Sequence, residues 1–111
     1  MTTRTMLIRN PADRRKVVGE VKPSNDEDVR RVVDAAEEGF VRWSAVSIAA
    51  RSKALASIAD ALEMRKEALA RSLVAEVGKP IKEARGEVAG AVGVFRHYST
   101  LRLDERTVAR E

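Results

Sequence analysis

The sequence predicts a mainly helical fold that opens with a β-hairpin. Two short β-branched segments near the N-terminus flank a turn-rich stretch, and the rest of the chain carries apolar stripes at helical spacing. A chain of 111 residues amounts to one domain at most, and no strand–helix–strand unit occurs in it. We therefore expect a hairpin over 5–21, helices over 24–44, 47–77 and 80–102, and an irregular tail over 104–111.

The hairpin prediction depends on the stretch Asn10-Pro11-Ala12-Asp13. This is turn chemistry, because proline fixes φ and the Asn and Asp side chains bond to nearby backbone. A lone two-stranded hairpin is barely stable in water, so it must pack against another part of the protein.

The first helix is predicted from its start signal and its apolar stripe. Ser24 and Glu27 fit the Ser-x-x-Glu capping box. The negative charges of the acidic run 26–28 interact favourably with the positive N-terminal end of the helix dipole. Consecutive helical side chains point about 100° apart, so these carboxylates do not converge on a cation. The stripe consists of Val29, Val32, Val33, Ala36, Phe40 and Trp43.

The second and third helices are separated by Gly78, which suits the left-handed position after a helix. Ser47 is the predicted N-cap of the second helix, and charged residues interrupt its apolar stripe, which predicts a bend or break near 64–66. Pro80 suits the first turn of the last helix. That helix has a stripe of small residues on one side, which lets another backbone approach closely: Gly86, Gly90 and Gly93.

Composition excludes several classes of site. The chain has no cysteine, so it supplies no disulfide, no thiolate zinc site and no thiol nucleophile. It has one histidine, His97, which excludes a multi-histidine metal cluster. No apolar run is long enough to span a membrane, and the opening residues contain no secretory signal. The expected compartment is the cytoplasm.

The net charge of +4 does not favour nucleic-acid binding, because acidic and basic residues interleave along the chain. The one dense basic cluster, Arg14-Arg15-Lys16, is accounted for by a solvated hairpin turn. Two alternative functions are a small basic nucleic-acid-binding protein and an autonomous helical module for protein interaction. The second alternative would place the glycine stripe at a helix–helix contact.

The residues show no catalytic constellation. Gly78-Lys79 resembles the end of a phosphate loop, but the required upstream glycine is replaced by Leu73 and the next residue is Pro80. His97 has no serine nucleophile beside it, because Ser99, two residues away, lies on a different face of the predicted helix. From these residues alone we expect a soluble hairpin-plus-helices unit with more apolar faces than it can cover.

Four blocks of sequence resemble the aldehyde dehydrogenase superfamily in order and spacing, over about residues 7–103. The first block pairs Ile8–Asp13 with Val17–Val21, and the second is the helix that ends in Phe40-Val41-Arg42-Trp43. The third is the helix over 51–63. The fourth is the most specific and consists of Glu76–Pro80, Glu83–Val88 and Phe95–Tyr98. One departure is Ile48, where the family usually has proline.

The resemblance implies the opening part of an α/β fold without its Rossmann-like sheet, and so an N-terminal scaffold. The family oxidises aldehydes to carboxylates with NAD or NADP, and the blocks are most similar to semialdehyde dehydrogenases. The family's catalytic cysteine, glutamate and asparagine, and its nucleotide-binding residues, come after the matched region. The resemblance therefore assigns no catalytic and no cofactor-binding residue to this chain, which is expected to be inactive and to bind no cofactor alone.

The resemblance also implies a candidate cation site and a set of partners. Many members hold a monovalent cation near the matched region, and the matching positions are Ile8 and Arg9, through their backbone carbonyls, and Glu76. Two further oxygens would come from downstream. The expected partners are the remainder of the dehydrogenase or copies of the chain itself, in an oligomer, and neither nucleic acid nor a membrane is expected.

Overall fold

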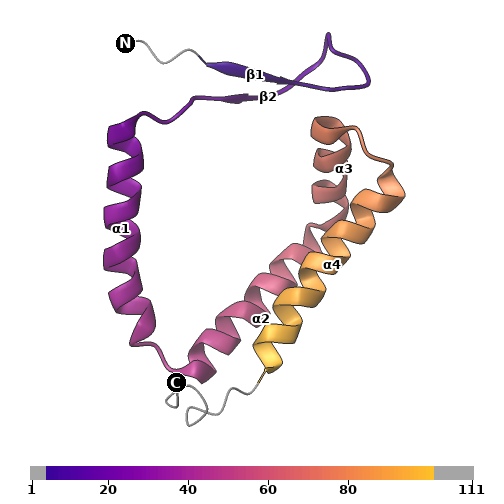
Figure 1. Ribbon diagram of the computed structural model, residues 1–111. Helices are drawn as coiled ribbons and strands as arrows, with labels where there is room; N and C mark the ends of the chain where they lie inside the picture. The colour runs from indigo at the N-terminus through magenta and orange to yellow at the C-terminus, as the bar shows by residue number, and fades with distance from the viewer. Residues whose placement is uncertain (1–4, 102–111) are drawn as a thin grey trace, which may run out of the picture.

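The computed structural model describes residues 5–101, which form a two-stranded antiparallel hairpin followed by four helices (Figure 1). The predicted fold class is confirmed. The predicted tail at 104–111 and the last residue of the predicted 80–102 helix lie outside the described residues. The elements are β1 (Met6–Arg9), β2 (Val17–Val21), α1 (Asp26–Ser44), α2 (Ile48–Met64), α3 (Lys66–Val77) and α4 (Ile81–Thr100).

The hairpin turn is built by the two side chains that the sequence singles out. The Asn10 side-chain oxygen accepts a hydrogen bond from the Ala12 N–H at 2.8 Å, and Asp13 accepts one from the Arg15 N–H at 3.2 Å. The strands pair with Ile8 opposite Gly19 and Arg9 opposite Val17, which leaves a bulge in β2.

The N-cap of α1 is Asn25, not Ser24. The Asn25 side chain accepts a hydrogen bond from the Asp28 N–H at 2.8 Å, and the Asp28 carboxylate accepts one from the Asn25 N–H at 3.2 Å. The capping-box prediction was therefore wrong by one residue. Two overlapping patterns fit the sequence, and the asparagine with its acidic N3 partner makes as good a box as Ser24 with Glu27.

Replacing Asn25 with alanine is expected to fray the first turn of α1 and to cost about 1 kcal/mol of helix stability. The matched control is Ser24→Ala, which lies outside the helix and should change little. NMR chemical shifts of the backbone over 26–30 report the helicity of that turn. A greater loss of helicity in Ser24→Ala than in Asn25→Ala would contradict this assignment of the cap.

A break at Arg65 divides the predicted 47–77 helix into α2 and α3, inside the interval where the apolar stripe is interrupted. Ser47 caps α2 as predicted, accepting from the Ala50 N–H at 3.2 Å. Gly78 ends α3 in the left-handed conformation, with φ 77°. Pro80 is the N-cap residue of α4, one position before the helix begins.

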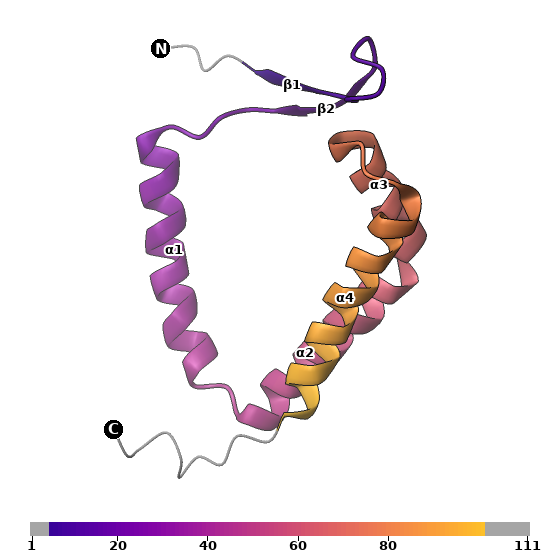
Figure 2. The same ribbon diagram turned by 45° about the vertical axis from the view of Figure 1, so that its right-hand side comes forward.

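The core lies between α4 and the helices that run beside it, α2 and α3. Figures 1 and 2 both show α4 running back along α3 and α2, with α1 standing apart on the other side of the molecule. The hairpin bridges the two arms at one end, and the short turn after α1 joins them at the other. The buried side chains are small: Ala59, Ala70, Ala84, Val88 and Val92.

The molecule is expanded for its size. Its radius of gyration is 18.9 Å, whereas a compact domain of this length has about 13 Å. Its accessible surface is 9569 Å², against roughly 6,100 Å² for a compact protein of this mass. The helix α1, in which no residue is buried, contributes to this large exposed surface.

The glycine stripe of α4 contacts no other element in the described part of the chain. A Cβ atom added at Gly86, Gly90 or Gly93 would meet no heavy atom within 4 Å. Instead, α4 packs on α2 and α3 through Ala84, Val88 and Val92. The close backbone approach expected at the stripe is therefore not made within residues 5–101. None of the helices in that range is long and apolar enough to cross a lipid bilayer.

Candidate functional site

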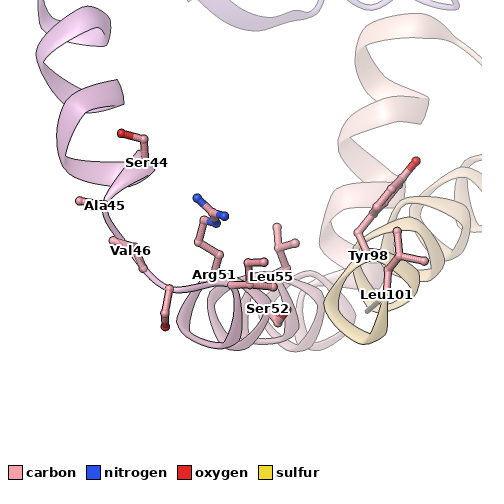
Figure 3. Close-up of a pocket in the computed structure, with 10 residues that line it drawn as sticks. Ser44, Ala45, Val46, Arg51, Ser52, Leu55, Tyr98 and Leu101 are labelled. Carbon is pink, nitrogen blue, oxygen red and sulfur yellow. The ribbon is translucent and has the colours of Figure 1, made fainter. Parts of the chain in front are cut away.

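An open hollow of about 580 Å³ lies where the α1–α2 turn approaches the C-terminal end of α4. Figure 3 shows Arg51 of α2 projecting upward between the turn on one side and Tyr98 and Leu101 on the other. The lining is mostly apolar, with three serines and one arginine among it. The residues that line it are Ser44, Ala45, Val46, Ser47, Ile48, Arg51, Ser52, Leu55, Tyr98 and Leu101.

The polar groups of this hollow already serve local structure. The Ser44 hydroxyl donates to the Val41 carbonyl at 3.0 Å, and Ser47 caps α2. The Arg51 guanidinium donates to the Trp43 carbonyl at 3.5 Å, which is long for such a bond. Of these three groups, only Arg51 joins the start of α2 to the end of α1. No hydrogen bond among the residues that line the hollow pairs a nucleophile with a base.

The hairpin contacts the helices at the joint between α3 and α4. A Cβ atom added at Gly78 would lie 2.6 Å from Cγ of Pro11, so the proline ring fills the space that a side chain would need. Asn10, beside this proline, lines a second open hollow with Arg71 and Arg85. The support that the hairpin requires comes from this joint.

An ion-pair network joins α3 to α4. Arg85 donates two hydrogen bonds to the Glu67 carboxylate, both at 2.9 Å, and Arg71 adds a contact at 3.0 Å. Lys79 pairs with Glu87 across the same joint. The Glu67–Arg85 pair could not be predicted from the sequence. Its partners are 18 residues apart on different helices, so the i,i+3 and i,i+4 spacings that indicate ion pairs within one helix do not apply. These ion pairs hold α3 and α4 in their relative orientation, and they include no nucleophile.

The pKa of Glu67 is lowered, chiefly because Arg85 donates hydrogen bonds to its carboxylate. A lowered folded-state pKa means that the ionised carboxylate favours the folded state, and this contribution is lost as the pH falls through that pKa. We expect the α3–α4 contact to weaken on acidification below about pH 4.3 and to be insensitive to pH above that.

An NMR titration of the Glu67 carboxyl carbon measures this effect. Replacing Arg85 with methionine should raise the pKa of Glu67 back toward the ordinary glutamate value. Replacing Arg71, whose contribution is smaller, should raise it less. A Glu67 pKa that is unchanged by Arg85→Met would show that the pair does not form in solution.

The three predicted cation ligands lie on β1 and α3, two elements that touch. Ile8 pairs opposite Gly19, and the Arg9 guanidinium donates to the Arg14 carbonyl at 3.0 Å. Glu76 lines a hollow on the α4 side of α3, with Leu73 and Glu87 among its neighbours. Among residues 5–101 no hydrogen bond or ion pair joins Glu76 to β1, and no group of three acidic or histidine side chains could hold a metal. The cation site stays a prediction.

The other candidate residues from the sequence analysis form no site in the described part of the chain. His97 is exposed, and its ring lies nearly perpendicular to that of Tyr98, with the ring centroids 5.2 Å apart. The basic cluster lies in the exposed hairpin loop, where Arg15 pairs with Asp13 at 2.9 Å and lowers the pKa of that aspartate. The acidic run at 26–28 forms the first turn of α1.

The described elements do not form a dinucleotide cradle. Their one sheet has two antiparallel strands, with no parallel strand–helix–strand unit in residues 5–101. Residues 5–101 therefore lack the parallel strand edge at which such folds bind a dinucleotide.

The comparisons with known proteins agree on one family. The sequence pattern of the aldehyde dehydrogenase family matches residues 1–109. The chain is 39% identical over 92 residues to an α-ketoglutaric semialdehyde dehydrogenase of Bacillus subtilis, covering 83% of this chain and 19% of that protein. It is 36% identical over 98 residues to a 1-pyrroline-5-carboxylate dehydrogenase of Geobacillus kaustophilus, covering 88% and 19%.

A solved structure supports the same assignment. The fold matches a betaine aldehyde dehydrogenase of Staphylococcus aureus, crystallised in complex with NAD⁺, with a TM-score of 0.81 and 30% identity over 86% of this chain and 20% of that one. The chain thus spans about a fifth of the length of the relatives that it matches. Since both its sequence and its hairpin-plus-helices fold match their N-terminal segment, this chain belongs to the aldehyde dehydrogenase family.

Proposed function

We propose that this chain is the N-terminal structural part of an NAD(P)-dependent aldehyde dehydrogenase that oxidises a semialdehyde to a carboxylate. The observation that carries the proposal is the alignment of 83% of the chain with one fifth of a semialdehyde dehydrogenase. The name of the second relative, a 1-pyrroline-5-carboxylate dehydrogenase, supports the same substrate class.

In this proposal the segment catalyses nothing by itself. The family's reaction needs a cysteine thiolate to attack the aldehyde, and this chain contains no cysteine. The nicotinamide cofactor, when bound, accepts the hydride from the substrate. The work of this segment is to supply packed helices and a hairpin that support the cofactor domain, and its partner is the remainder of the dehydrogenase.

A chimera tests the proposal. The matching segment of the Bacillus subtilis semialdehyde dehydrogenase is replaced by this chain, and NADH formation is followed with α-ketoglutaric semialdehyde. We expect the chimera to be active and the isolated 111-residue chain to be inactive. The unmodified enzyme and the enzyme lacking its first fifth serve as controls.

Two outcomes would contradict the proposal. The first is aldehyde oxidation by the isolated chain, which would place a catalytic site in these residues. The second is a folded but inactive chimera beside an active unmodified enzyme, which would mean that this segment does not serve as a dehydrogenase N-terminus.

A further inference from the structure

We draw no further inference here: the strongest candidate, the exposed apolar face of α1 that includes Val33, Phe40 and Trp43, carries none because nothing in the structure shows what covers it.

Discussion

Replacing Gly78 with alanine is expected to open the joint between the hairpin, α3 and α4. The backbone there is left-handed, with φ 77°, and a side chain in that conformation costs about 1–2 kcal/mol. The added Cβ would also lie 2.6 Å from Cγ of Pro11, which is closer than van der Waals contact allows. Because the proline ring is stiff, the hairpin loop must shift away, and the total loss should exceed the backbone cost alone.

Hydrogen exchange on dilute chain measures this loss as faster exchange in the last turn of α3 and in the hairpin. The matched control is Gly90→Ala in the middle of α4, where an added Cβ meets nothing within 4 Å. That change should stabilise α4 by about 0.8–1.0 kcal/mol. If the two alanines had the same effect, the left-handed joint and its contact with Pro11 would be refuted.

Replacing Ala84 with leucine is expected to separate α4 from α3. Ala84 is fully buried, as is Ala70 of α3, and both belong to the cluster that includes Val88. Adding three carbons at a closed contact costs about 1–3 kcal/mol. Since the Glu67–Arg85 pair lies beside this contact, the helices should lose both their packing and their ion pair.

The exposed Ala89 provides the control for this substitution. It lies on the same helix, and its change to leucine should stay within about 0.5 kcal/mol. Hydrogen exchange of α3 and α4 distinguishes the two variants. A leucine at position 84 that is tolerated as well as one at position 89 would show that α3 and α4 do not pack through these alanines.

The sequence predicts the local elements well because their signals are local. The Asn10 and Asp13 turn, the Ser47 cap, the stop at Gly78 and the break near Arg65 are all set by residues within a few positions. The error at the start of α1 is local too, since Ser24 and Asn25 both begin an acceptable box and only geometry decides between them.

Long-range contacts were not predictable in this way. The Glu67–Arg85 pair and the Pro11–Gly78 contact join residues that are far apart in the sequence. They depend on how α3 packs against α4 and the hairpin, which no local pattern of residues specifies. The glycine stripe of α4 predicts a close approach, yet open space faces it in residues 5–101. Small residues indicate where a backbone is able to approach, and they do not indicate which one does.

Thermal unfolding of the isolated chain, followed by circular dichroism together with light scattering, tests most directly that these apolar faces belong to a larger protein. The account predicts a broad transition that shifts with concentration and is accompanied by association, because α1 and the sides of α4 have no cover of their own. A sharp transition, independent of concentration and without scattering, would show that the chain closes its own core, and it would contradict the account.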